Sequence, residues 1–227
     1  MHIRSKKLRN LIRIITPFVL IPLVAILGTV IFDAKKHIFI SLFVAVLSLL
    51  VFAAGFERKS TGSRRLVISA VMIALSVAGR MIPVFKPVTA MTIISAVYLG
   101  PEAGFLVGSM SALLSNFFFG QGPWTPFQML GWGLIGFIAG LLSKQLKKSR
   151  ILLLIYGLVS GITYSFVMDI WTVLWHQGGF TLDLYIASIV TALPHTILYA
   201  VSNCVFLWLL APAFGRKLDR IKIKYGV

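Results

Sequence analysis

Eight long apolar stretches, separated by short polar or basic segments, dominate this sequence. Hydrophobic residues make up 58% of the chain, charged residues only 12%, and the mean hydropathy is +0.93. A soluble domain of 227 residues has too small an interior to bury that much apolar surface, so lipid must surround much of it. The composition therefore predicts an all-α polytopic membrane protein. The predicted spans are 14–32, 37–56, 66–82, 88–100, 102–118, 127–142, 151–175 and 184–210.

The first stretch follows a basic tail, an arrangement that is also typical of a cleaved signal peptide. Its apolar run is long, however, and the segment ILGTVIFDAKK ends it without a clear small-x-small cleavage site. We therefore expect an uncleaved span. Most of the eight stretches approach the about 20 residues that cross a ~30 Å hydrocarbon core, whereas 88–100 is clearly short.

The distribution of Lys and Arg predicts the orientation, because cytoplasmic segments of membrane proteins are enriched in positive charge. If the N-terminus is cytoplasmic and all eight stretches cross, 17 Lys and Arg lie inside and four outside. If 88–100 were re-entrant instead, the count would be 8 inside and 13 outside. We therefore expect eight crossings and two cytoplasmic termini. The net charge of +16 then reflects membrane orientation, and we expect no nucleic acid partner.

This orientation places three unusual connections on the outer side: 83–87 (PVFKP), the break within 115–133 (SNFFFGQGPWTPFQMLGWG) and 176–183 (HQGGFTLD). All three are rich in Pro, Gly, aromatic or amide residues. The inner connections are basic turns or the tight GPEAG at 100–104. Gly and Pro are also common in ordinary turns that have no binding role. Each outer loop is therefore either a plain turn or part of a binding surface.

Two amide residues flank the central outer loop, since Asn116 ends one span and Gln128 begins the next. Trp132 lies one turn beyond Gln128, on the same face of the predicted helix. Amide side chains donate and accept hydrogen bonds. Prolines on both sides of Trp124 limit the freedom of the loop. We expect this loop, which also carries Gln121, to fix the Trp124 ring in a position where a flat ligand can pack against it.

Ionisable and aromatic residues also occur inside the later spans. Asp169 is the only acid in the interior of a span, Trp171 and Trp175 follow it, and His195 lies about 16 Å deep in the last span. Such polar residues usually face the bundle interior or a wet cavity. Structural alternatives stay open: an interfacial tryptophan belt, an Asp169–Arg80 pair, and a hydrogen bond from His195 to a carbonyl freed by the preceding proline.

Two stripes of small residues repeat every four positions. One runs through SAVMIALSVAGR and the other through the span at 102–118. Small residues let membrane helices approach closely. Each stripe therefore packs either within the bundle or against another subunit. The stripes consist of Ala70, Ala74 and Ala78, and of Gly104, Gly108 and Ala112.

Motifs for catalysis and metal binding are absent from the sequence. We find no phosphate loop ending in GK[ST], no G-x-S-x-G, no H-E-x-x-H and no paired carboxylates. The four histidines lack ligand spacing, and the lone Cys204 excludes intrachain disulfides. We expect no enzymatic activity, no metal and no cofactor. If transport requires ATP, another chain must supply its hydrolysis.

The segments RRLVISAVMIALSVAGR and TIISAVYLGPEAGFLVGSMSALLSNFFFGQGPWTPFQMLGWGLIGFIAGLL give the chain a family resemblance. Residues 64–212 resemble the substrate-binding S-components of energy-coupling factor (ECF) vitamin transporters. The alanine stripe, the LGPEAGFLVG turn and the GQGPWTPFQMLGWG loop carry the resemblance. It implies a six-helix bundle that binds a vitamin from the outer side of the bacterial cell membrane. The form NFFFGQGPWTPFQM is most similar to members assigned to cobalamin or related corrinoids, although riboflavin-like or queuine-like ligands would also fit.

The resemblance also implies partners and site residues. The alanine stripe would dock on a membrane-embedded coupling subunit, which two cytoplasmic ATPase subunits drive. The candidate ligand residues are Arg80, Asn116, Gln121, Trp124, Gln128, Trp132, Asp169, Trp171, Trp175, His176 and His195.

One departure from the family concerns the N-terminus. We expect residues 1–60 to form an extra two-helix hairpin before the S-component-like domain at 61–227. This hairpin either lies at the periphery or alters docking. The competing functions are a stand-alone secondary transporter, which would normally need mid-membrane ionisable groups and inverted repeats, and a membrane scaffold without a pocket.

Overall fold

Helices account for all the regular secondary structure in the residues that the computed structural model describes, which are 6–31, 37–55, 59–176 and 180–225. One segment in the N-terminal helical region, η1, is a π-helix. The elements are α1 (Lys6–Ile15), η1 (Thr16–Leu20), α2 (Ile21–Ile31), α3 (His37–Ala54), α4 (Lys59–Gly79), α5 (Val88–Leu99), α6 (Pro101–Phe119), α7 (Thr125–Leu141), α8 (Ser143–Lys148), α9 (Arg150–His176) and α10 (Leu182–Tyr225).

Each predicted span corresponds to a helix or to the continuous series α1–η1–α2, which confirms the predicted all-α fold class. The observed bounds differ from the predicted ones at several helix ends, including the starts of α1 at Lys6 and of α4 at Lys59. The chain leaves α4 at Gly79 rather than 82, shortly before Pro83 interrupts it. The basic turn at 143–150 contains the short helix α8. α10 continues to Tyr225, because charged residues end the apolar run after 210 without ending the helix.

Five helical segments are long and apolar enough to cross a membrane: Lys7–Gly28, His37–Ala54, Pro101–Phe119, Arg150–Trp175 and Leu182–Lys224. The apolar helices α5 and α7 are shorter. Every residue of α5 except Tyr98 is buried. Its neighbours are α4, α6, α7, α8, α9 and α10. This short helix therefore lies among other helices rather than against lipid.

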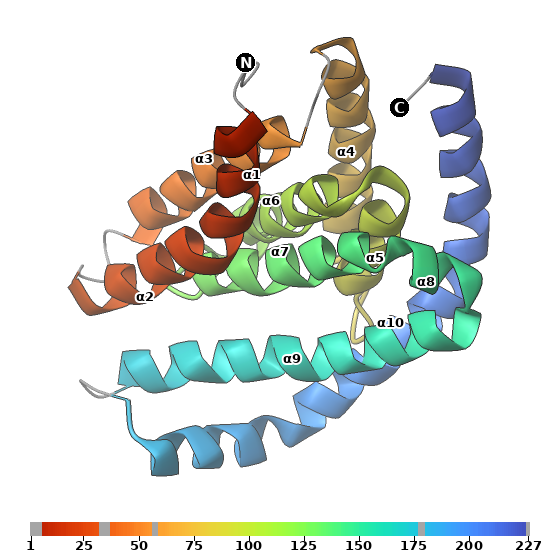
Figure 1. Cartoon of the computed structure of the whole chain (residues 1–227). Helices are drawn as coiled ribbons and strands as arrows, with labels where there is room; N and C mark the ends of the chain where they lie inside the picture. Colours follow the sequence, from red (N-terminus) through yellow and green to blue (C-terminus); the bar gives the residue numbers. More distant parts are fainter. Residues whose placement is uncertain (1–5, 32–36, 56–58, 177–179, 226–227) are drawn as a thin grey trace.

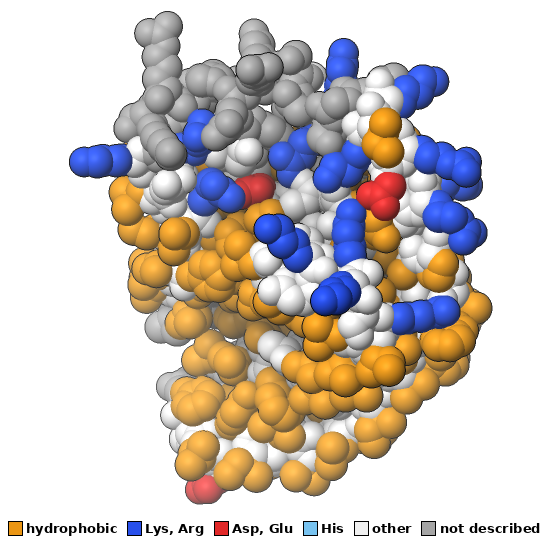
Figure 2. Space-filling view, turned by 45° about the vertical axis from the view of Figure 1, so that its right-hand side comes forward, with side chains coloured by type: hydrophobic (Ala, Val, Ile, Leu, Met, Phe, Trp, Pro, Cys, Tyr) orange, Lys and Arg blue, Asp and Glu red, His pale blue; other side chains and the backbone are white. Residues whose placement is uncertain are grey.

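Two groups of helices are visible in Figure 1, with α1–α7 above and α9 packed along the first half of α10 below. The second half of α10 rises on the right, and α10 also packs against α5. α1 begins and α10 ends at the same end of the molecule (Figure 1), which is the arrangement expected from the predicted even number of crossings. Figure 2 shows Lys and Arg gathered toward that end, above a surface that is mainly hydrophobic.

The glycine-containing stripe of α6 packs inside the bundle. A β carbon at Gly108 would lie 2.4 Å from the carbonyl oxygen of Trp132, and one at Gly136 would lie 2.3 Å from that of Gly104. Ala112 is fully buried on the same helix. The backbones of α6 and α7 thus touch, which only glycine permits at these positions.

The alanine stripe of α4 has the opposite environment. Ala70, Ala74 and Ala78 are all exposed, whereas Met72 and Ser76 on the other side of the helix are buried. That buried side packs against α5 and α6. The stripe therefore forms a flat, uncovered face, which we call the alanine face.

The N-terminal extension packs mainly on α6 and α7. α3 contacts both helices, and α2 contacts α7. From α3, Val44, Leu47 and Val51 join the hydrophobic core. At the end of the molecule where α1 begins, Arg13 donates a hydrogen bond to the buried carboxylate of Glu102. The extension therefore packs tightly on the core and leaves the alanine face exposed.

Candidate functional site

The loop between α6 and α7 is held by its own side chains. Gly120 adopts φ +98°, a left-handed conformation that favours glycine. Gln121 donates to a carbonyl of α6 at 2.9 Å and accepts from the Thr125 hydroxyl at 3.1 Å. A β carbon at the buried Gly122 would overlap the ring of Trp124. The loop therefore fixes Trp124 at the N-terminus of α7.

A buried hydrogen-bond network lies next to this loop. Arg80 donates to Oδ1 of Asn116 at 2.7 Å and also to the Ser115 hydroxyl. The amide nitrogen of Asn116 donates to Gln128 Oε1 and to Thr125 Oγ1, both at 2.8 Å. The network joins the end of α4 to α6 and α7, and Asn116 is only 1% exposed. Three residues predicted from the sequence, Arg80, Asn116 and Gln128, therefore lie together.

Arg80 is a buried cation among aromatic rings and neutral acceptors. Its guanidinium carbon lies 5.1 Å from the ring centroid of Phe119 and 5.3 Å from that of Trp132. Both ring contacts are within cation–π range. In the described part of the chain, no carboxylate forms an ion pair with it. Because a buried charge normally has an opposite partner, Arg80 is the side chain of this site that most needs an anion or a carbonyl.

A second cation lies close by in the loop between α4 and α5. The ammonium group of Lys86 lies 5.3 Å from the same Phe119 ring. Burial lowers the pKa of Lys86, and the nearby Arg80 lowers it further. The loop also contains a tight turn at Val84, which has φ +65°, because Phe85 N–H donates to the carbonyl of Pro83 at 2.7 Å. A β-branched residue at positive φ is strained, so this loop is held by its surroundings.

A stack of aromatic rings continues from the network into the bundle. Trp132 and Tyr164 stack with centroids 4.6 Å apart and an interplanar angle of 11°, and Tyr199 meets Tyr164 edge-on at 5.6 Å. The indole N–H of Trp132 donates to the Thr89 hydroxyl at 3.1 Å. The stack links α7, α9 and α10 below the hydrogen-bond network.

A second aromatic group lies beside the loop. Trp124 meets Trp171 edge-on at 5.8 Å, and Trp171 lies 6.5 Å from Trp175. The indole nitrogen of Trp171 is buried and has no hydrogen-bond partner in the described chain. Trp175, in contrast, is 39% exposed, as expected of an interfacial tryptophan. Trp124 and Trp171 thus belong with the loop, and Trp175 lies at its margin.

The remaining predicted residues lie elsewhere. Asp169 faces α10, where it accepts a hydrogen bond from Ser188 at 3.2 Å, and its other carboxylate oxygen lacks a partner among the described residues. The predicted alternative of an Asp169–Arg80 pair is therefore wrong. His195 lies on the exposed side of α10, so the expectation that it faces the interior is also wrong. The side chain of His176, at the end of α9, lies outside the described residues.

The sequence reasoning missed several contributors to the site. Tyr164 and Tyr199 extend the aromatic stack, and Ser115 and Thr125 complete the polar network. Tyr164 was detectable, because it lies seven residues before Trp171 and hence on the same helical face. The hydroxyl groups carried no comparable signal, since serine and threonine are common in membrane helices.

An apolar cavity adjoins the stack between α7 and α9. Its volume is about 250 Å³, and its lining includes Gly131, Ile135, Tyr156 and Tyr164. A β carbon at Gly131 would already meet the Tyr164 ring at 3.2 Å. The cavity extends the aromatic stack toward the middle of α7 and α9.

Together these features define a multi-pass membrane protein with a polar and aromatic site between its helices. The family model described as ECF-type riboflavin transporter, S component, matches residues 60–213, and the chain belongs to this family. It is thus the substrate-binding subunit of an ECF transporter for a vitamin-like substrate. No curated protein and no solved structure matches the chain. The family description names riboflavin, so the predicted preference for cobalamin gains no support from it. We call the following residues the outer site: Arg80, Asn116, Trp124, Gln128, Trp132, Tyr164 and Trp171.

Proposed function

We propose that the chain captures a vitamin with a flat, carbonyl-bearing ring from the outer side of a bacterial plasma membrane and binds it at the outer site. This chain then forms a complex with a membrane-embedded coupling subunit, and two cytoplasmic ATPase subunits drive transport of the vitamin through that complex. Family membership supports the transport role. The observation that carries the ligand class is Arg80, a buried cation that has only neutral hydrogen-bond acceptors in the described chain.

The chemistry of Arg80 favours a planar ligand edge. Guanidinium presents five N–H donors in a rigid, planar fork that suits paired oxygen acceptors. The neighbouring rings of Trp132 and Phe119 offer aromatic surfaces beside it. Gln128 and Asn116 add amide groups that hydrogen-bond to polar groups of a ring system. The unpartnered indole N–H of Trp171 supplies a further buried donor.

We infer that riboflavin is the first ligand to test and cobalamin the second. The isoalloxazine ring of riboflavin is flat and carries carbonyl groups on one edge, which matches stacking rings beside an arginine. A corrin ring is larger and surrounded by amide side chains, which also suit Asn and Gln. The family description names riboflavin, and this gives it priority.

The alanine face supports the docking proposal. Ala70, Ala74 and Ala78 are exposed together on α4, and small side chains let another membrane helix approach closely. Arg80 lies directly beyond the end of the same helix, so α4 connects the docking face to the outer site. We propose that the coupling subunit contacts this face.

The test is a titration of the detergent-purified chain with riboflavin and with cobalamin by calorimetry. Trp124→Ala should weaken binding by about 1–3 kcal/mol, roughly 5- to 150-fold in Kd, because a buried aromatic contact is lost. Arg80→Gln should weaken binding at least as strongly, because the guanidinium fork is lost.

The matched control is Trp208→Ala, which removes a tryptophan that is 54% exposed on the second half of α10. It should bind with unchanged affinity. Thermal unfolding in detergent verifies that each variant is folded. Unchanged affinity in folded Trp124→Ala and Arg80→Gln would refute the outer site, and the absence of binding by either vitamin would refute the ligand class.

A further inference from the structure

A second cavity lies at the opposite end of the molecule from the outer loops, between the N-terminal extension and α7. Its volume is about 490 Å³. Apolar side chains form most of its wall, with two polar side chains at the end nearer the start of α1. The lining residues are Asn10, Arg13, Ile14, Phe18, Phe137 and Leu141.

The apolar wall of this groove is open to the membrane. Ile14 is 62% exposed, Leu141 57% and Phe18 42%. Phe18 and Phe137 meet edge-on with centroids 5.4 Å apart and form the floor between α7 and the extension. Exposed apolar residues on a membrane-crossing helix contact acyl chains, so a hydrocarbon chain is the natural occupant of this part of the groove.

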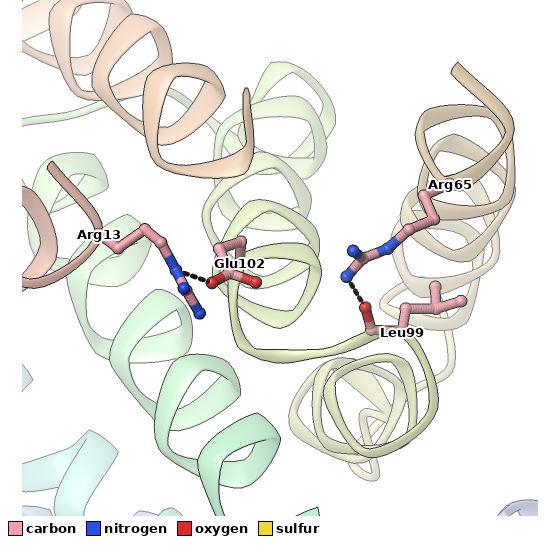
Figure 3. Close-up of polar contacts among 4 residues, drawn as sticks. All are labelled: Arg13, Arg65, Leu99 and Glu102. Atoms are coloured by element: carbon pink, nitrogen blue, oxygen red, sulfur yellow. Dashed lines mark hydrogen bonds and ion pairs between the residues drawn. The ribbon is translucent and has the colours of Figure 1, made fainter. Parts of the chain in front are cut away.

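Arg13, at the polar end of the groove, uses only some of its N–H donors. The Nε of Arg13 donates to Glu102, its one partner in the described chain, and the side chain is 36% exposed. Figure 3 shows that the bond to Glu102 is made by Nε of Arg13 and not by its terminal nitrogens. Since a guanidinium has five N–H donors, Arg13 has donors left for another acceptor.

A second guanidinium group lies near Arg13 and Glu102. Glu102 lies between Arg13 and Arg65, which approach it from opposite sides (Figure 3). Burial lowers the pKa of Arg65, the Glu102 carboxylate opposes that shift, and Arg13 adds to it. The guanidinium groups of Arg13 and Arg65 therefore lie close enough to Glu102 and to each other to interact electrostatically.

We propose that this groove binds an anionic phospholipid of the cytoplasmic leaflet, with its phosphate on Arg13 and an acyl chain along Ile14, Phe18 and Phe137. The expected orientation places this end of the chain at the cytoplasmic surface, where anionic lipids meet basic residues. A free phosphate ion would use Arg13 but none of the apolar wall. The bound lipid links α1 to α7 and thus fastens the N-terminal extension to the core.

The experiment is native mass spectrometry of the full chain, titrated with phosphatidylglycerol or phosphatidylcholine of identical acyl chains. Wild-type protein should retain phosphatidylglycerol about fivefold better, the effect of one basic residue near a membrane surface. Arg13→Gln should lose this preference. Glu102→Gln should keep it, because Arg13 remains and is released from its partner.

Two controls separate the lipid from other causes. Lys144→Gln removes an exposed positive charge outside the groove lining, so it should keep the preference. Glycerol phosphate at the same concentration should not displace the lipid. The proposal is overturned if Arg13→Gln retains the preference, if Glu102→Gln loses it equally, or if glycerol phosphate displaces the lipid.

Discussion

The stripes on α4 and α6 have the same four-residue spacing but opposite environments. On α6, Gly104 and Gly108 face the backbone of α7 so closely that a β carbon has no room. On α4, Ala74 and its two neighbours in the stripe are exposed and covered by no helix among the described residues. The difference lies in the residue type as well as the position. Glycine marks contact between two backbones of one bundle, whereas alanine leaves a smooth face that still favours the helix.

This comparison shows what spacing alone leaves open. A four-residue repeat of small residues indicates close helix packing, but it does not specify the partner. The structure supplies that information, because the α6 stripe is already covered and the α4 stripe is not. An exposed packing surface in an otherwise well-packed core is therefore the better candidate for a second subunit.

The largest expected effect is at the covered stripe. Gly108→Leu adds a branched side chain where even a β carbon would lie 2.4 Å from the Trp132 carbonyl oxygen. Overpacking of this kind costs about 1–3 kcal/mol or more even where side chains can move, and here the obstacle is backbone. We expect loss of the folded monomer, measured by size-exclusion chromatography in detergent. A normal elution profile and thermal stability would contradict the contact between α6 and α7.

The same kind of substitution on the alanine face should affect only assembly. Ala74→Leu lies on an exposed surface, so folding and vitamin affinity should match wild type. Co-purification of the coupling subunit should be lost, and vitamin uptake by cells should fall to background. Ala187→Leu, at an exposed position on the first half of α10, is the matched control and should retain both. Loss of vitamin binding in Ala74→Leu would mean that the stripe packs the bundle.

The smallest expected effect follows removal of the N-terminal extension. Deleting residues 1–60 and restarting translation near Ser63 uncovers the sides of α6 and α7 but leaves the alanine face unchanged. Vitamin affinity and capture of the coupling subunit should stay within about threefold of wild type, because neither surface involves the extension. Thermal stability in detergent should fall moderately, since Val44, Leu47 and Val51 leave the core. If the deletion variant inserts correctly but does not bind the vitamin, the extension is required for vitamin binding.

The sequence predicted the helices well because a long run of apolar residues is a strong signal of a membrane helix. Each of the eight predicted stretches falls on a helix or on the series α1–η1–α2, and the sequence also identified the loop that holds Trp124. The exact ends were harder to predict, because α10 remains helical after its apolar run stops. Polarity marks where a helix leaves the membrane, whereas backbone hydrogen bonding decides where it ends.

The candidate site was only partly predictable. Asn116 and Gln128 flank one loop, so their proximity followed from local sequence. The contact of Arg80 with Asn116 depends on how α4 packs on α6, 36 residues away, which a single sequence does not encode in a readable pattern. His195 and the alternative Asp169–Arg80 pair were misplaced because a depth along a helix does not specify a face. Two residues apart on α9, Asp169 and Trp171 point to different neighbours.

The burial of α5 has a consequence for how the protein is made. With 12 residues, this helix is about 18 Å long, well short of the bilayer's hydrocarbon thickness. It also carries Thr89, Thr92 and Ser95, which add to the cost of meeting lipid tails. The insertion machinery therefore gains little by releasing α5 alone. Gly100 and Pro101 join it directly to α6, so we expect the two helices to enter the membrane together as a hairpin.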